Sequence, residues 1–325
     1  MGEDQVYEGF SGTITLCEGE RVLETFCQGY ADFPNQRPNG PDTAFGMASG
    51  SKIFTAVAAL RLVERSLLGL DEPVNPRIAP WAVHEAASLR HLLTHTSGIA
   101  DYFDEEAGED YEALWRERPN YRMRSPEDFL PLFAGRPGSF APGERFRYSD
   151  SGFVLAAYLV ERASGRAFPD YLRETVFEPC GMGRTGCFRL DMPPPDAATG
   201  YIEEGGSLRS NLYSIPLVGG GDGGCLTTGA DMARFWTALE EGRLLKPDTV
   251  ESMLSVQVPR TDEDDRYGLG VWILEDDDEV AFVQGFDPGV RFLSYFDRRS
   301  GRSLTISANV ECRLGPLVRA WLPRL

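Results

Sequence analysis

Residues 47–54 read Met-Ala-Ser-Gly-Ser-Lys-Ile-Phe, and an apolar run with helical spacing, Ile53–Arg65, follows directly. The run predicts a helix, so Ser49 lies at or near a helix N-terminus. Side chains three positions apart share one helix face, which places Ser49 beside Lys52. The helix dipole and burial both lower the pKa of a lysine there, so the pair predicts a serine nucleophile with a lysine base. On its own, the pattern also fits a polar helix start followed by a surface lysine.

The basic residues set Lys52 apart. Only Lys52 and Lys246 are lysines, and the rest of the 32 basic residues are arginines. Lysine can be deprotonated inside a protein, whereas arginine cannot. In so arginine-rich a chain, we interpret Lys52 as a residue kept for its chemistry.

Strand-like runs lie at both ends of the chain. Two β-rich runs near the start are separated by the turn Glu18-Gly19-Glu20, and four more lie near the end. Such runs, bounded by turn residues, are typical of antiparallel strands. The predicted strands are Phe10–Cys17, Arg21–Tyr30, Tyr267–Leu274, Glu279–Phe286, Val290–Phe296 and Ser303–Val310.

The middle of the chain has helical spacing instead. We therefore expect an α+β fold: one antiparallel sheet built from both chain ends, flanked by helices, with a mostly helical region inserted. The expected domains are 1–65 plus 205–325 for the sheet and 66–204 for the helical part, with the active site in the cleft between them. The predicted helices are Ile53–Arg65, Leu89–Thr94, Phe153–Ala163, Pro169–Val176, Asp231–Glu241 and, closing the chain, Leu314–Leu322.

A second motif makes a chance origin of the Ser49–Lys52 pair less plausible. Residues 146–153 read Phe-Arg-Tyr-Ser-Asp-Ser-Gly-Phe, after the turn Ala141-Pro142-Gly143. Ser49-x-x-Lys52 followed by Tyr148-x-Asp150 resembles the class C-like branch of the serine β-lactamase and penicillin-binding-protein superfamily, whose pattern is S-x-x-K and then Y-x-N. Three further segments resemble that branch in its own order, so the resemblance covers about residues 41–300: Ser88–Ile99, Glu178–Thr185 and Gly223–Asp231.

The resemblance implies a β-lactamase/transpeptidase-like fold and acyl transfer through an acyl-enzyme on Ser49. Lys52 and Tyr148 would relay the proton, and the backbone N–H groups of Ser49 and Phe286 would form the oxyanion hole. It implies no cofactor and no metal. The branch includes D,D-peptidases, D-aminopeptidases and esterases, so the expected substrate is a small ester, amide or peptide.

Two departures from the branch narrow this expectation. Asp150 stands where the branch has Asn, and an ionised Asp150 near Lys52 favours the ammonium form of the lysine. Lys52 and Asp150 could then titrate as a coupled pair, or Tyr148 could carry more of the proton transfer. The third motif, within Val283–Val290, keeps Gly285 but lacks the Lys or His that holds a substrate carboxylate, although Arg291 lies close by. Asp150 and Gly285 count with three other residues as candidate substrate contacts: Gln284, Arg291 and Asn211.

The favoured function is therefore hydrolysis of a neutral ester or amide, with weak or no β-lactamase activity. Two alternatives stay open. One is a penicillin-binding D,D-peptidase or β-lactamase. The other is a non-catalytic relative that binds a ligand or senses acylation, because Asp150 and the missing cation depart from the active pattern.

Composition excludes several other classes. The chain has 325 residues, 42% of them hydrophobic, and a net charge of −18, so nucleic acid and anionic membrane surfaces are disfavoured. No apolar run is long enough to span a membrane, and no secretory signal is visible. The six cysteines lack metal spacing and are expected to be reduced, although Cys17 and Cys27 could meet across a hairpin; a cytoplasmic location is expected. The acidic runs Asp262–Asp265 and Glu275–Glu279 predict solvated loop tips.

Two other patterns have simpler explanations. Gly219–Gly224 matches G-x-G-x-x-G but lacks the β-α-β setting of a dinucleotide site, so a loop beside the cleft is favoured. His91 and His95 are four residues apart without the glutamate of a zinc protease, and we interpret both as structural.

Overall fold

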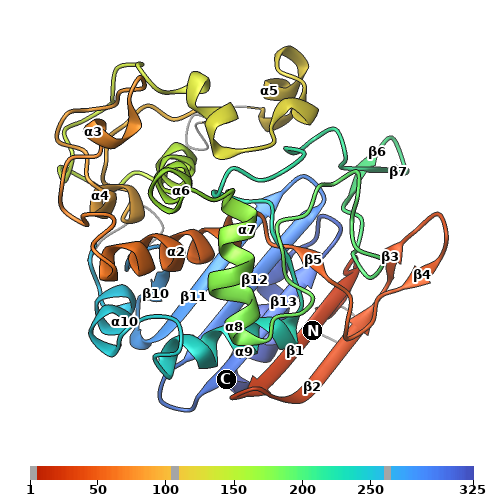
Figure 1. Ribbon diagram of the computed structural model, residues 1–325. Helices are drawn as coiled ribbons and strands as arrows, with labels where there is room; N and C mark the ends of the chain where they lie inside the picture. Colours follow the sequence, from red (N-terminus) through yellow and green to blue (C-terminus); the bar gives the residue numbers. More distant parts are fainter. Residues whose placement is uncertain (1–5, 104–109, 260–264) are drawn as a thin grey trace.

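The computed structural model describes residues 6–103, 110–259 and 265–325. Within these ranges a seven-stranded antiparallel sheet runs through the molecule in the order β2-β1-β13-β12-β11-β10-β9 (Figure 1). Strands from the two chain ends are direct neighbours, with Gly12 of β1 opposite Ala308 of β13. The predicted sheet built from both chain ends is confirmed. Its strands are β1 Gly12–Glu18, β2 Arg21–Gln28, β9 Arg266–Tyr267, β10 Trp272–Leu274, β11 Asp277–Asp287, β12 Val290–Asp297 and β13 Arg302–Ala308.

One predicted strand is wrong. The run Tyr267–Leu274 folds back on itself as β9 and β10, with Trp272 opposite Tyr267. Gly270 lies in the turn with a φ of +79°, and a Cβ there would come within 2.5 Å of the Ala56 side chain. Only glycine tolerates both the backbone angle and the contact, so the chain turns where β-propensity alone predicts continuation.

The two faces of the sheet carry separate hydrophobic clusters. Ala281 and Val283 of β11 belong to the larger cluster, which includes the helices α2 and α6. Val280 and Phe282 point the other way, as strand alternation requires, into a cluster covered by α11. The long helices are α2 Lys52–Glu64, α6 Asp150–Ser164, α9 Gly229–Glu240, α10 Pro247–Leu254 and α11 Leu314–Trp321.

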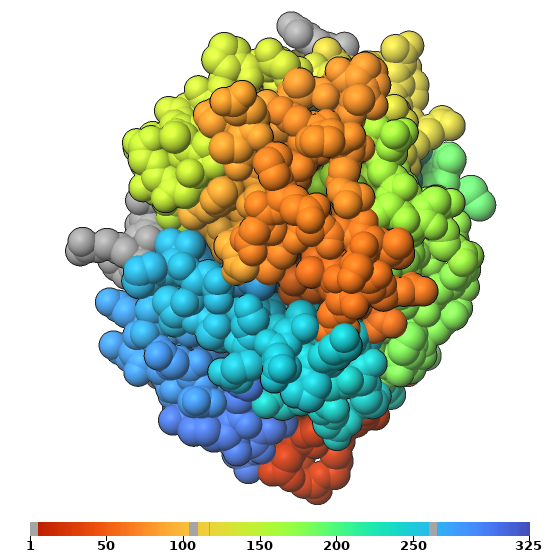
Figure 2. Space-filling view, turned by 60° about the vertical axis from the view of Figure 1, so that its left-hand side comes forward, coloured from red at the N-terminus to blue at the C-terminus, as the bar shows by residue number. Residues whose placement is uncertain are grey.

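The helix α2 is buried on nearly all sides, from Lys52 to Leu60. A helix covered all round carries no single apolar stripe, which explains its weak amphipathic pattern. In Figure 2 the segment of α2 and the loops after it (orange) lies against the segment of α9 and α10 (cyan). There Arg61 donates to the Leu244 carbonyl, and the Lys246 N–H donates to Glu64 at 2.7 Å.

Shorter elements complete the fold. Most predicted helices are confirmed within a few residues, but Pro169–Val176 divides into α7 and a π-helical turn, η4. The division into the two predicted domains stays a prediction. The remaining elements are β3 Tyr30–Asp32, β4 Arg37–Pro38, β5 Phe45–Gly46, η1 Ala48–Ser51, α3 Asn75–Ile78, α4 Leu89–Leu93, α5 Tyr111–Glu117, η2 Asn120–Arg122, η3 Pro126–Leu132, α7 Phe168–Leu172, η4 Arg173–Phe177, α8 Glu178–Cys180, β6 Tyr201–Glu204, β7 Ser207–Ser210, β8 Leu226–Thr227 and η5 Leu322–Arg324.

The cysteines do not behave as expected. Cys187 and Cys225 form a disulfide, so the expectation that all thiols are reduced is wrong. Gly186 bridges Leu226 of β8, which brings the two sulfur atoms together. In the β1–β2 hairpin Cys17 faces Val22 instead of Cys27, so that pair does not meet. The disulfide also removes the reduced-thiol argument for a cytoplasmic location.

Two further expectations concern the surface. Glu275 and Asp276 lie at the turn between β10 and β11, Asp277–Glu279 begin β11, and the residues of this run are mostly exposed as predicted. The other acidic run, Asp262–Asp265, lies outside the described residues except for Asp265. None of the helices in the described ranges is long and apolar enough to span a membrane.

Candidate active site

Ser49 and Lys52 meet at the start of α2. Ser49 lies in the short helix η1 directly before α2, after Ala48, whose φ of +44° makes a sharp turn. The Lys52 Nζ lies 2.9 Å from the Ser49 Oγ. It also donates to the Asp150 Oδ1 at 2.6 Å and to the Asp222 carbonyl oxygen at 2.9 Å. The serine, the lysine and Asp150 therefore form one hydrogen-bonded group.

The pKa of Lys52 depends on its pairing with Asp150. The side chains of Lys52 and Asp150 are only 3% and 8% exposed. Burial disfavours the ammonium, but attraction from Asp150, Tyr148 and Asp222 outweighs it and raises the pKa of Lys52 well above its ordinary value. Of the two opposing expectations from sequence, this direction agrees with the ammonium favoured by Asp150 and not with the lowered pKa, because a carboxylate stands where the related branch has an uncharged amide. Lys52 is an ammonium in the resting site.

Tyr148 stands beside this group on an aromatic support. The Lys52 Nζ lies 4.9 Å from the centre of the Tyr148 ring. The ring stacks on His95 at 4.3 Å and on Trp272 at 6.3 Å between centroids. These planar contacts fix the orientation of the tyrosine toward Lys52.

His95 is a buried structural residue, in agreement with its interpretation from sequence. Its Nδ1 accepts the Ser149 N–H at 3.0 Å, so its Nε2 carries the proton and donates to the Tyr267 hydroxyl at 3.0 Å. Burial, with repulsion from Lys52, holds the pKa of His95 well below its ordinary value. A neutral imidazole therefore ties Ser149, the neighbour of Asp150, to the sheet.

Asp101 holds the start of α6, and sequence reasoning missed it. Its carboxylate accepts the backbone N–H of Asp150 at 2.9 Å, and both the N–H and the hydroxyl of Ser151 at 3.0 and 2.9 Å. Burial and repulsion from Asp150 raise the pKa of Asp101 to about 7. The only sequence signal was an acidic residue just after the segment Ser88–Ile99. Asp101 positions Asp150 against Lys52.

The end of β11 presses against the serine turn. A Cβ on Gly285 would lie 2.0 Å from the Met47 oxygen and 2.7 Å from the Ser49 nitrogen, so only glycine fits. This close approach brings the backbone of Phe286 alongside Ser49. The pairing of β10 with β11 reaches Phe282, opposite Trp272. Beyond that pair, the edge of β11 is not paired with β10 and faces the cavity in front of Ser49.

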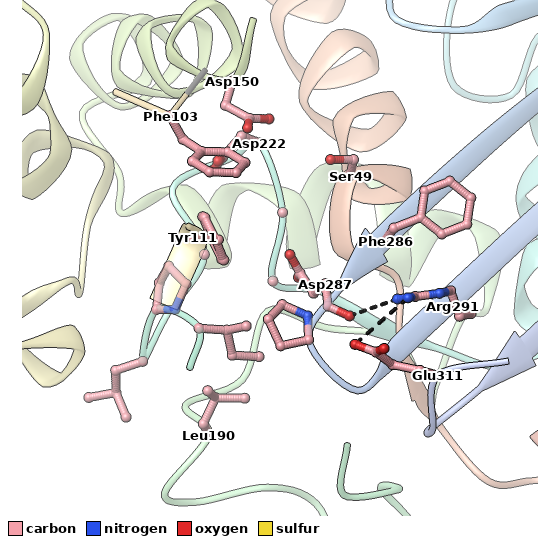
Figure 3. A pocket seen from close by; sticks show the side chains of 17 residues that line it. Ser49, Phe103, Tyr111, Asp150, Leu190, Asp222, Phe286, Asp287, Arg291 and Glu311 are labelled. Carbon is pink, nitrogen blue, oxygen red and sulfur yellow. Dashed lines mark hydrogen bonds and ion pairs between the residues drawn. The ribbon is translucent and has the colours of Figure 1, made fainter. Parts of the chain in front are cut away.

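A cavity of about 350 Å³ opens in front of Ser49 (Figure 3). Four of the predicted site residues line it: Ser49, Asp150, Phe286 and Arg291. Sequence reasoning missed most of the other side chains, which come from loops far apart in the chain. These are Phe103, Tyr111, Leu190, Ile215, Pro216, Leu217, Asp222, Asp287, Pro288 and Glu311, with Gly219, Gly223 and Gly224 of the predicted glycine loop.

Two predicted substrate contacts lie elsewhere. Asn211 is buried, donates to the Pro288 carbonyl at 3.0 Å and lines a neighbouring cavity of about 310 Å³. Gln284 alternates with Gly285 along β11, which places it on the face of the sheet away from Ser49. Neither residue lines the cavity in front of Ser49, and their role as substrate contacts stays a prediction.

Arg291, the predicted cation of the pocket, already has partners within the protein. Arg291 donates to the carbonyl oxygens of Asp287 and Val290 at 3.1 and 2.8 Å, and lies 3.8 Å from Glu311. Its guanidinium also lies over the Phe286 ring. Across the described ranges, no group of three or more His, Cys, Asp or Glu residues is arranged to hold a metal ion.

Known proteins share this architecture. A family model described as Beta-lactamase matches residues 4–311. Penicillin-binding protein 4* of Bacillus subtilis is 30% identical over 93% of this chain and 68% of its own length. Esterase EstB of Burkholderia gladioli is 38% identical over 53% of this chain and 45% of its own length. The crystal structure of a penicillin-binding protein from Bacillus halodurans is 39% identical, with a TM-score of 0.93 over 99% of both chains.

Proposed function

The chain belongs to the β-lactamase family of serine hydrolases, and we propose that Ser49 is its nucleophile and that its substrate is an ester or amide with no carboxylate beside the reacting carbonyl. One observation carries the first half of the proposal. The Lys52 Nζ lies 2.9 Å from the Ser49 Oγ, and Ser49 lines the cavity. A serine with a buried proton-transfer partner at a cavity wall has the arrangement of an activated nucleophile.

The proton of Ser49 needs an acceptor, because an ammonium cannot take it. The nearest acceptor is Asp150, whose Oδ1 lies 2.6 Å from the Lys52 Nζ. In the proposed step Lys52 passes a proton to Asp150, and the resulting amine takes the Ser49 proton as Oγ bonds to the carbonyl carbon. In the same proposal Tyr148, whose ring lies beside the Lys52 Nζ, gives its proton to the leaving group and is left as a phenolate. Water then attacks the acyl carbon and gives a proton to the phenolate of Tyr148, the proton on Asp150 returns through Lys52 to the Ser49 Oγ, and the acid product leaves.

The negative charge on the carbonyl oxygen would be held by the backbone N–H groups of Ser49 and Phe286. The contact at Gly285 supports this assignment, since it brings β11 against the serine turn. Each such donor is worth about 3–4 kcal/mol in the transition state. Because both donors belong to the backbone, the sheet and η1 set their spacing.

The substrate class follows from the charges around the cavity. Val283 stands where the related branch carries Lys or His, and it is buried in the apolar cluster. Arg291 is already bound to two carbonyl oxygens and faces Glu311. A substrate carboxylate would meet Asp150 and Asp222 without a free counter-charge. We therefore place esters and amides without a carboxylate ahead of β-lactams and peptide C-termini.

Hydrolysis of p-nitrophenyl butyrate tests the nucleophile. The wild type should release p-nitrophenol enzymatically, and Ser49→Ala should lose at least about a hundredfold in kcat/KM. The exposed serine Ser300 supplies a matched control, because Ser300→Ala should keep the wild-type rate. Full activity in Ser49→Ala would overturn the assignment.

Intact mass after mixing with a penicillin separates the alternatives. We expect neither a stable adduct nor loss of the penicillin. A lasting adduct on Ser49 without ester turnover would instead indicate a penicillin-binding or acylation-sensor role, and rapid loss of the penicillin would indicate a β-lactamase.

A further inference from the structure

The wall of the cavity is strongly acidic. Four carboxyl groups line it, together with a single arginine. Asp150 is paired with Lys52, Asp222 accepts the Tyr102 hydroxyl, and Glu311 faces Arg291. The fourth carboxyl, Asp287, has no hydrogen bond or ion pair to any residue in the described ranges. Lys52 and Arg291 attract its charged form without a bond to it, and burial outweighs them, so ionising this carboxyl is costly unless a ligand supplies a direct contact.

The position of Asp287 puts this group close to the reaction. It is the last residue of β11 and directly follows Phe286, the proposed oxyanion donor. By strand alternation its side chain shares the face of Gly285, the face that contacts the serine turn. In Figure 3 the Asp287 carboxyl projects into the cavity on the Ser49 side, and Arg291 reaches only its backbone oxygen. Asp287 would therefore lie close to the part of a ligand that carries the reacting carbonyl.

We propose that Asp287 is the counter-ion for an ammonium group on the acyl part of the substrate, so that the enzyme selects acyl donors with a protonated amine near the reacting carbonyl. The inference rests on the proposed function and deepens it: the scissile ester or amide is uncharged, and the positive charge lies beside it. A charge-assisted hydrogen bond in a cavity is among the stronger polar contacts. Asp287 thus determines specificity and takes no part in bond making.

The surroundings of Asp287 make this selection depend on pH. Burial, with repulsion from Asp150 and Asp222, raises the pKa of Asp287 to about 8. The carboxyl is therefore largely protonated at neutral pH while the cavity is empty, and an arriving ammonium draws the proton off. The preference for an ammonium should rise as pH approaches 8, until the amine itself loses its proton. The charged and titratable groups around it are Lys52, Tyr111, Asp150, Asp222, Arg291 and Glu311.

Equilibrium binding tests the inference without catalysis. The probes are alaninamide, as both enantiomers, and isobutyramide, which has a methyl group in place of the ammonium. Titration calorimetry with Ser49→Ala near neutral pH should show at least one alaninamide enantiomer binding about tenfold or more tightly than isobutyramide. The preference should disappear in Ser49→Ala/Asp287→Asn. It should survive in Ser49→Ala/Glu311→Gln, which removes a carboxyl from the exposed part of the same wall.

The outcomes are distinct. Equal binding of the two amides, or a preference that Asp287→Asn leaves intact, would overturn the inference. Asp287→Glu serves as a second variant, because it should keep part of the preference where Asp287→Asn does not. The binding assay does not use the Ser49 hydroxyl. Its failure therefore leaves the ester-hydrolysis test untouched, and a failed hydrolysis test with a clear ammonium preference would leave a binding pocket without the proposed chemistry.

Discussion

Replacing Asp150 by asparagine should move the pH dependence of the reaction. The Lys52 Nζ lies 2.6 Å from the Asp150 Oδ1, with both side chains buried. At an effective dielectric constant of about 20, two unit charges at that distance attract by about 6 kcal/mol. One pH unit corresponds to about 1.4 kcal/mol, so the loss of even a quarter of that attraction moves a midpoint by more than about one unit.

The direction follows from which form of Lys52 the charge favours. Asp150 favours the ammonium, so removing its charge lowers the pKa of Lys52 and makes the free amine available at lower pH. In Asp150→Asn the amine can accept the Ser49 proton directly, and no transfer to residue 150 is needed. We therefore expect the alkaline-going rise of kcat/KM to shift to lower pH by at least about one unit, with activity retained near neutral pH.

The assay is the pH profile of kcat/KM for p-nitrophenyl butyrate from about pH 5 to about pH 10, corrected for uncatalysed hydrolysis. Glu311→Gln serves as the matched control, because that carboxyl lines the same cavity but faces Arg291 and has no bond to Lys52. Its midpoint should move much less. A midpoint in Asp150→Asn that stays with the wild type, or moves upward, would refute the coupling of Lys52 to Asp150.

Three further predictions concern single positions. Lys52→Arg should lose roughly a hundredfold or more in kcat/KM, nearly as much as Lys52→Ala, because arginine cannot give up a proton; an active Lys52→Arg would contradict the relay. Gly285→Ala should cost about 2 kcal/mol or more in the free energy of unfolding by urea and abolish activity, since its Cβ would lie 2.0 Å from the Met47 oxygen, whereas Gly40→Ala, in open space, should change little. Asp287 keeps its proton in the folded protein up to about pH 8 but loses it near pH 4 when unfolded, so it makes the folded state less stable as pH rises between those values. Asp287→Asn should therefore raise the unfolding free energy at about pH 8 by roughly 1–3 kcal/mol more than at about pH 5, and an equal effect at both would argue against the raised pKa.

Local patterns were sufficient for the main frame of the molecule. The strands at both chain ends alternate or carry β-branched residues, and their turns are marked, so the sheet could be predicted. Ser49 and Tyr148 lie 99 positions apart, and their motifs indicated that they meet with Lys52. Their catalytic roles stay predictions, because proximity alone does not establish chemistry.

The wall of the cavity could not be predicted in the same way. Three separate segments bring Asp101, Tyr111 and Asp287 to the site. Their positions depend on how loops distant in sequence pack against the sheet. The same dependence hid the disulfide, since Cys187 and Cys225 are brought together by the pairing of their neighbours Gly186 and Leu226. The pKa of Lys52 could be anticipated only through the second motif, because it depends on a carboxylate 98 positions away in the sequence.

The sheet order has a consequence for how the protein is made. The strand β1 lies between β2 and β13, and its Gly12 pairs with Ala308 near the other end of the chain. While the ribosome is still adding the middle of the chain, the β1–β2 hairpin has an open edge and an uncovered apolar face. Pairings this distant in sequence form slowly, and unpaired edges invite association between chains. The edge of β1 that pairs with β13 therefore stays open until the end of the chain has been made, and during that interval the hairpin can associate with other chains.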